Sequence, residues 1–210
     1  MFGIINFEAF ILASLLLNLT PGADTMYILG RSISQGKKAG ILSALGIASG
    51  ALIHCLFAVL GLSILLAKSA LAFQIVKYVG AFYLIYLGIK MLTSSSKASF
   101  DLTEKVSNVN FRKIYLSGIL TNLLNPKVAF FFLAFIPQFI NETYSNSPIP
   151  FLVLGLTFIT TGTIWCLILA FFSSKLSEKI RANYRFKIWL DKITGSLFIV
   201  LGIKLALSKK

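Results

Sequence analysis

The sequence predicts an all-α membrane protein with six transmembrane helices, arranged as two inverted three-helix repeats. Of its 210 residues, 57% are hydrophobic and 13% are charged, and the mean hydropathy is +0.84, outside the range of soluble globular domains. Apolar runs recur along the chain, and each is about long enough to cross roughly 30 Å of hydrocarbon. These runs cover residues 4–19, 39–67, 70–92, 114–140, 151–172 and 188–207.

The first run spans a membrane only if it continues through the stretch NLTPGADTMYILG, residues 18–30. Pro21 removes a helix donor and clashes with the preceding turn, and Gly22 lets the backbone leave the helix. We therefore predict that the first helix is broken at these two residues. Irregular backbone at membrane depth occurs only where it is buried in protein or lines a wet cavity, so the break predicts an interior site.

The second run, 39–67, contains the only histidine, His54, and overlaps two Gly-x-x-x-Gly spacings, at 36–40 and 46–50. Such spacings let helices approach closely. We expect them to pack helices within the chain, with homodimer formation as the alternative. His54 is predicted to be a packed neutral side chain, with a proton relay as the alternative.

The fourth run repeats the features of the first. Its stretch NLLNPKVAFFFLAF places Asn122 before Pro126 much as Asn18 precedes Pro21. The fourth helix is therefore predicted to be broken at Pro126. The fifth run is predicted from its apolar length alone.

The sixth run resembles the third. The stretch FQIVKYVGAFYLIYLGIKML (73–92) and the stretch WLDKITGSLFIVLGIKLAL (189–207) share Leu-Gly-Ile-Lys. Each half contains three spans, an odd number, so tandem copies enter the membrane from opposite sides, as in many secondary transporters. A single transmembrane domain, 1–210, is predicted, with repeat one at 1–92, a connection at 93–112 and repeat two at 113–210.

The net charge of +13 does not indicate a nucleic-acid partner, because the lysines and arginines lie mainly in the connections between spans. Connections one, three and five carry most of them. The positive-inside bias places these three connections in the cytoplasm and both termini outside. No cofactor is predicted, and Cys55 and Cys166, inside apolar runs with no paired spacing, are expected to be inert core residues.

Substrate binding is predicted at the two breaks. Asp24 lies just past the first and Lys127 just past the second, and a lone charge at the bilayer centre costs at least ~2.5 kcal/mol, so each needs a partner or water. We expect Asp24 to face the ammonium of an amino acid, and Lys127 or nearby helix amides to face its carboxylate. The predicted substrate-binding residues are Asn18, Pro21, Gly22, Asp24, Asn122, Asn125, Pro126 and Lys127.

Other roles for these residues stay open. A proline in a transmembrane helix is often only a kink, Lys127 can snorkel or pair structurally with Asp24, and the asparagines can bond between helices without touching a ligand. Asp24 is also predicted to couple transport to protons, because it is the only acidic residue beside either break.

Three blocks of sequence resemble the lysine exporter superfamily and, within it, the homoserine/threonine exporter branch of bacterial inner-membrane amino acid exporters. They are TPGADTMYILGRSISQGKKAGILSALGIASG (20–50), KYVGAFYLIYLGIKML (77–92) and FRKIYLSGILTNLLNPKVAFFFLAFIPQF (111–139). The family pattern Pro-Gly-Pro followed by Asp or Asn is matched except at Ala23. The resemblance implies a multi-pass inner-membrane protein, not an enzyme, that exports amino acids from the cytoplasm by proton antiport.

Two rival functions differ in what they require. A divalent-cation exporter of the same superfamily would need more intramembrane carboxylates than Asp24 alone. An intramembrane hydrolase would pair His54 with Ser63, but nine residues on one helix separate them by roughly 13 Å along the axis and half a turn. Neither rival is supported by the residues, so the amino acid export that the resemblance implies is the function we expect.

Overall fold

The computed structural model describes residues 2–62, 70–93, 109–144, 147–173 and 184–207. Within these ranges the regular structure is helical, apart from one isolated β-bridge between Ile4 and Ile140. The helices, in chain order, are α1 (Phe7–Leu19), α2 (Ala23–Gln35), α3 (Lys37–Phe57), η1 (Ala58–Leu62), α5 (Ala70–Thr93), α6 (Phe111–Leu123), α7 (Pro126–Phe130), η2 (Phe131–Phe135), η3 (Ile136–Phe139), η4 (Glu142–Tyr144), α8 (Pro148–Phe171) and α10 (Tyr184–Leu207).

Local sequence signals set the starts of several helices. The side chain of Asn110 accepts a hydrogen bond from the backbone N–H of Lys113 at 3.0 Å and so caps α6. Ser147 caps α8. Pro148 follows in the first turn, where a backbone N–H would have no helical acceptor, so its missing N–H costs no hydrogen bond. Between α2 and α3 the chain turns at Gly36, whose φ of +86° is one that L side chains rarely adopt.

The helices agree with the predicted spans to within a few residues. By length and apolar composition, residues 37–61 and α8 can each cross a membrane, and up to four spans result if each bent pair counts as one. The bent pairs are α1 with α2, at 48°, and α6 with the helices of 126–139, at 51°. The protein is thus an α-helical membrane protein. Most of the third and fifth connections and Ser63 lie outside the described residues.

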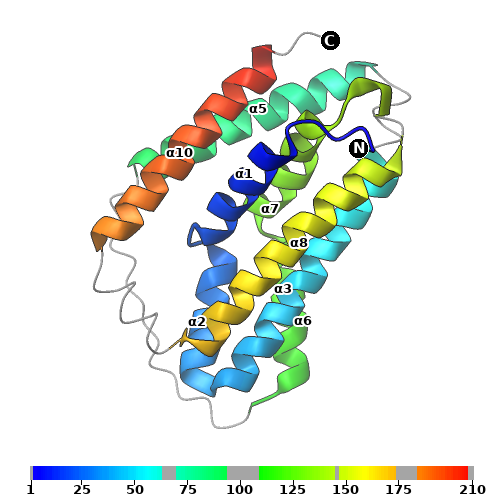
Figure 1. Ribbon diagram of the computed structural model, residues 1–210. Coiled ribbons are helices and arrows are strands. Elements are labelled where there is room, and N and C mark those ends of the chain that lie inside the picture. Colours follow the sequence, from blue (N-terminus) through cyan, green and yellow to red (C-terminus); the bar gives the residue numbers. More distant parts are fainter. Residues whose placement is uncertain (1, 63–69, 94–108, 145–146, 174–183, 208–210) are drawn as a thin grey trace.

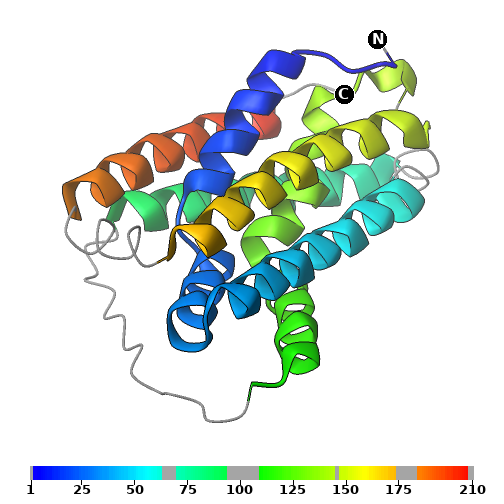
Figure 2. The ribbon, with the colours of Figure 1, turned by 60° about the horizontal axis from the view of Figure 1, so that its bottom comes forward.

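The two halves of the chain have the same element order: a broken helix, a long helix and a second long helix. Figure 1 shows each element running in the opposite direction to its counterpart, α3 against α8 and α5 against α10. In the α5–α10 pair, which Figure 2 shows side by side, the glycines of the shared Leu-Gly-Ile-Lys segments both lie at the contact. A Cβ on Gly88 would lie 2.6 Å from Ile199, and one on Gly202 would lie 2.8 Å from the Ala81 carbonyl.

Two contacts between described segments mark opposite ends of the molecule. At one end, the Lys38 ammonium lies 4.5 Å from the ring centre of Phe111, so the first connection and the end of the third are neighbours. At the other end, the Ile5 N–H donates to the Phe139 carbonyl at 2.9 Å. Lys38, at the start of α3, and the start of α6 therefore share one end of the molecule.

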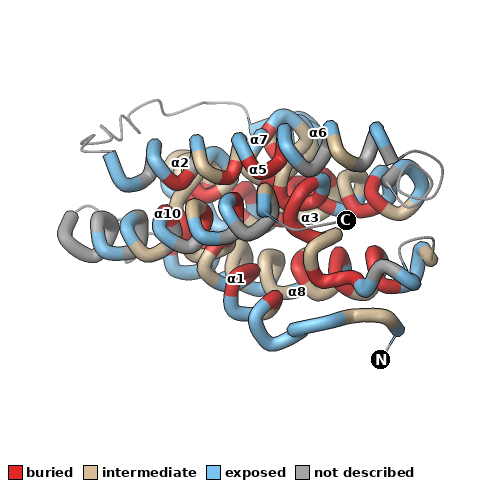
Figure 3. The backbone as a smooth tube through the Cα atoms, turned by 90° about the horizontal axis from the view of Figure 1, so that it is seen from above, coloured by how far each residue is buried: buried red, intermediate tan, exposed pale blue. Residues whose placement is uncertain are grey.

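Two hydrophobic clusters fill the interior. Figure 3 shows in red the buried stretches of the helices. The aromatic cluster, towards the end that holds Ile5, contains Phe10, Phe131, Phe132, Phe135, Phe139, Phe151 and Phe158, with aliphatic neighbours that include Leu17 and Val128. The aliphatic cluster, towards the basic end, contains Ile28, Leu29, Ala44, Ile47, Leu169 and Ala170. The space between these clusters is where the broken helices meet.

The glycine spacings of the second span pack helices within the chain. A Cβ on Gly46 would clash with the Tyr115 carbonyl and lie 3.1 Å from the Cα of Gly118, and a Cβ on Gly50 would lie 2.8 Å from the Cβ of Asn122. These glycines therefore let α3 approach the backbone of α6. Homodimer formation stays a prediction.

Replacing Gly46 by alanine is expected to lower the free energy of unfolding by about 1–3 kcal/mol, because backbone atoms of α6 must move aside. Gly61→Ala is the matched control, since nothing lies within 4 Å of its added Cβ. Thermal unfolding of the detergent-solubilised protein measures both. Equal melting temperatures for the two variants would contradict the packing described for α3 and α6.

Candidate functional site: the cavity between the broken helices

Both breaks occur where the sequence places proline. α1 ends at Leu19 and α2 begins at Ala23, so Pro21 and Gly22 lie in the first break. The second break lies between Leu123 and Pro126, and Pro126 opens α7. The predicted breaks are confirmed. Because proline has no N–H, the carbonyls four residues earlier, those of Leu17 and Asn122, lose their usual helical donors.

Side chains from other helices contact both carbonyls, and the Asn122 carbonyl also accepts from the backbone N–H of Asn125 at 3.0 Å. The Lys127 ammonium donates to the carbonyl of Leu17 at 3.2 Å and to that of Thr20 at 3.0 Å. The Nε2 atom of His54 lies 3.3 Å from the Asn122 carbonyl; since a carbonyl only accepts, this ring nitrogen carries the hydrogen. The protein itself therefore supplies donors to both carbonyls.

His54 thus has a partner at the second break. Its ring also stacks on Phe132, with ring centres 6.0 Å apart. Both contacts agree with the predicted packed side chain, and the hydrogen bond adds a role in supporting the break.

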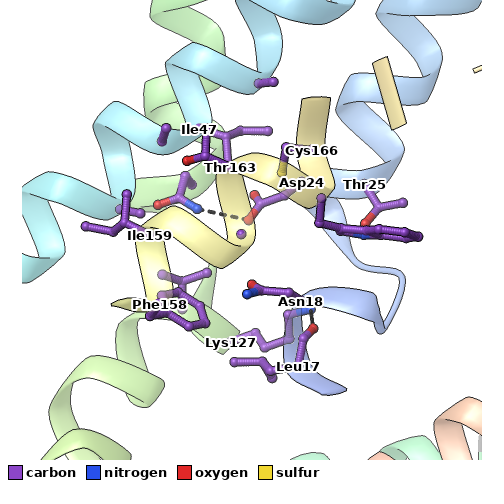
Figure 4. A pocket seen from close by; sticks show the side chains of 17 residues that line it. Leu17, Asn18, Asp24, Thr25, Ile47, Lys127, Phe158, Ile159, Thr163 and Cys166 are labelled. Atoms are coloured by element: carbon purple, nitrogen blue, oxygen red, sulfur yellow. Dashed lines mark hydrogen bonds between the residues drawn. The ribbon is translucent and has the colours of Figure 1, made fainter. Parts of the chain in front are cut away.

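A cavity of about 50 Å³ lies between the two breaks, at the boundary of the two hydrophobic clusters (Figure 4). Leu17, Val128 and Phe158 connect it to the aromatic cluster, and Ala44 and Ile47 connect it to the aliphatic cluster. The lining comes from five helices and the start of α7: Leu17, Asn18, Asp24, Thr25, Ala44, Ile47, Ala48, Ala51, Asn122, Lys127, Val128, Phe158, Ile159, Gly162, Thr163, Trp165 and Cys166.

The polar side chains of the cavity are joined across the two halves. The Asn122 amide donates to Asp24 Oδ2 at 2.9 Å, a bond drawn as a dashed line in Figure 4. The Asn18 amide donates to the Thr161 hydroxyl of α8 at 3.2 Å. Among the lining residues, Asp24 is the one carboxylate and Lys127 the one ammonium. The cavity therefore presents one charge of each sign in a largely apolar wall.

The predicted site residues fall into two groups. Asn18, Asp24, Asn122 and Lys127 line the cavity. The other four shape the breaks: Pro21, Gly22, Asn125 and Pro126 do not line it.

The residues of the break have specific local tasks. A Cβ on Gly22 would lie 3.2 Å from the Lys127 ammonium nitrogen, so glycine leaves room for that side chain. The Asn125 carbonyl oxygen Oδ1 accepts from the Lys127 N–H at 3.1 Å and caps α7. Asn125 therefore positions Lys127 from outside the cavity lining.

Sequence reasoning missed the contribution of α8. Gly162, Thr163, Trp165 and Cys166 line the cavity, as does Thr25 of α2. One signal was present, because the run Thr-Thr-Gly-Thr at 160–163 interrupts an otherwise apolar span. Polar residues at mid-membrane depth face the interior of a helix bundle.

The described residues contain no group of three or more histidine, cysteine or acidic side chains that could hold a metal ion. A helical membrane protein with a polar cavity between two broken helices has the general plan of a transporter.

Comparisons with known proteins identify the family. A sequence model of the LysE type translocators matches residues 15–209, so the chain belongs to the LysE type translocator family, whose members are transporters and not enzymes. The uncharacterized membrane protein YrhP of Bacillus subtilis is 33% identical over 207 residues, which cover 95% of this chain and 98% of that protein. Proteins named leucine efflux protein from Salmonella choleraesuis and Salmonella paratyphi A are each 30% identical over 209 residues, covering 98% of this chain and 96% of theirs. No solved structure matches the chain at a significant level.

Lys127→Met is expected to lower the free energy of unfolding by about 1–3 kcal/mol, because the Leu17 carbonyl then has neither a helical donor nor the ammonium. Lys113→Met, at an exposed position of α6, is the matched control. The melting temperature in detergent should fall by several degrees for the first variant and stay unchanged for the second. If both variants melt like the parent protein, Lys127 does not hold the first break.

Proposed function

We propose that the protein exports amino acids from the cytoplasm and that the cavity between the breaks binds them. The cavity is the observation that carries this proposal, because one carboxylate and one ammonium in an apolar wall complement a zwitterion with an uncharged side chain. The relatives named leucine efflux protein, which match nearly end to end, support the same class of substrate. The resemblance to homoserine/threonine exporters adds those two amino acids to the candidates.

In this proposal the substrate lies across the two halves of the protein. Asp24, held by the Asn122 amide at 2.9 Å, faces the substrate ammonium. The positive charge of Lys127 attracts the carboxylate. Apolar lining residues such as Ile47, Phe158 and Ile159 surround the side chain. Asn18, bonded to Thr161, contributes a polar edge.

The six predicted spans form two inverted three-helix repeats in this account. The matching element order, the opposite directions in Figure 1 and the reciprocal glycine contacts of α5 and α10 support the arrangement. Transport then requires the aromatic and the aliphatic cluster to separate in turn, because each closes one side of the cavity. The protein lies in the bacterial inner membrane with its basic connections in the cytoplasm. The aliphatic cluster therefore closes the cytoplasmic side of the cavity.

Asp24 couples export to protons in the same proposal. One carboxylate can hold either a proton or the substrate ammonium, and this competition is sufficient for exchange if the empty, unprotonated carrier reorients poorly. The competing account gives Asp24 only the task of neutralising Lys127. The two accounts differ in what happens when both charges are removed together.

The test is efflux from proteoliposomes loaded with labelled leucine, homoserine or threonine, with and without a pH gradient. The parent protein should release at least one of these amino acids faster when the gradient is present. Asp24→Asn keeps the shape of the side chain but cannot titrate, so it should lose the gradient-driven part, about tenfold or more in rate. Absence of efflux for every amino acid tried would overturn the proposed function.

The double variant Asp24→Asn with Lys127→Gln separates coupling from charge balance. Coupling through Asp24 predicts that gradient-driven export stays lost in the double variant. Restored proton-driven export would show that Asp24 only balances Lys127. Membrane abundance, measured for each variant by immunoblot, corrects the rates for folding losses.

A further inference from the structure

Trp165 of α8 carries a polar atom that the fold leaves without a partner. Its side chain lines the cavity, and its indole Nε1 is buried with no hydrogen-bond acceptor in the described part of the structure. More than nine in ten buried polar groups in proteins are paired, so an unpaired one calls for an explanation. An indole N–H only donates. A ligand that forms a hydrogen bond with the Trp165 indole must therefore supply an acceptor.

Two oxygens of residues that line the same cavity are acceptors without a donor. Asp24 Oδ1 and Asn122 Oδ1 are buried and lack donors within the described residues. Asn122 is only 2% exposed, and its other amide atom is already committed to Asp24 at 2.9 Å. Both oxygens belong to residues of the cavity lining. One donor and two acceptors without partners thus belong to residues that line the same cavity.

A ligand that completes all three atoms must carry donors and an acceptor together. The ammonium of an amino acid offers three N–H groups, enough for both oxygens, and its carboxylate accepts at either oxygen. Water can satisfy the same atoms one at a time. Only a ligand with both groups satisfies them together and also matches the charges of Asp24 and Lys127.

We propose that Trp165 determines specificity: its indole N–H donates to the carboxylate of the bound amino acid, while Asp24 Oδ1 and Asn122 Oδ1 accept from the ammonium. This inference rests on the proposed function and adds a residue from α8 to the site. It assigns Lys127 a supporting charge, since that ammonium already bonds the carbonyls of Leu17 and Thr20. The cavity accordingly discriminates against amines that lack a carboxylate.

The test compares leucine with 3-methylbutylamine, which is leucine without its carboxylate, by equilibrium binding to the purified full-length protein. Trp165→Phe keeps an aromatic ring but removes the N–H. It should weaken leucine binding about tenfold or more, as expected for one hydrogen bond to a charged group, and leave binding of the amine unchanged. Trp189→Phe, at a position of α10 that is 61% exposed, should change neither affinity.

Equal losses for both ligands would assign Trp165 a packing role only and overturn the inference. Unchanged leucine binding by the variant would overturn it as well. In either case leucine binding and export by the parent protein would leave the proposed function standing. Failure of the parent protein to bind or export any amino acid would instead remove the proposed function, and the inference with it.

A second measurement leaves Trp165 intact. In the Trp189→Phe variant Trp165 is the one remaining tryptophan, and a hydrogen bond from its indole to a carboxylate shifts its fluorescence emission to longer wavelength. Leucine should produce this shift and 3-methylbutylamine should not. The same emission with and without saturating leucine would overturn the inference even if Trp165→Phe fails to fold.

Discussion

Two prolines deep in a helical membrane protein impose the constraint on which this structure depends. Pro21 and Pro126 each leave a backbone carbonyl without its helical donor, and hydrocarbon offers no water to replace it. For Leu17 the donor is the Lys127 ammonium. The Asn122 carbonyl accepts from the Asn125 N–H and also lies 3.3 Å from His54 Nε2. Since Lys127 follows Pro126 directly, the second break supplies the donor for the first.

The contacts between the two breaks bring polar groups together in the interior. The Lys127 ammonium reaches the first break, while Asn122 at the second break donates to Asp24 just past the first. The cavity that results lies between an aromatic and an aliphatic cluster. A cavity with one charge of each sign between two broken helices has the general plan of a transporter, and membership of the LysE type translocators agrees with it.

The sequence predicted the features that have local causes. Proline in the interior of an apolar run removes a helix donor, so both breaks were predicted. Asp24, Asn122 and Lys127, which were predicted beside them, line one cavity. The sequence could not predict which side chain completes each freed carbonyl, because Lys127 and Leu17 are 110 positions apart. Asn125, predicted to bind substrate, caps α7 in the structure. The α8 lining was missed because the polar residues at 160–163 are few within an otherwise apolar span.

The central claim is that a transported amino acid occupies the cavity between the breaks. Cys166 lines that cavity, whereas Cys55 is fully buried, so Cys55→Ala leaves a single thiol that reports on the site. The most direct measurement is the rate of Cys166 alkylation by N-ethylmaleimide as leucine, homoserine or threonine is added. The account predicts that a transported amino acid slows alkylation in proportion to its occupancy. An alkylation rate that is unchanged at concentrations that saturate export would contradict it.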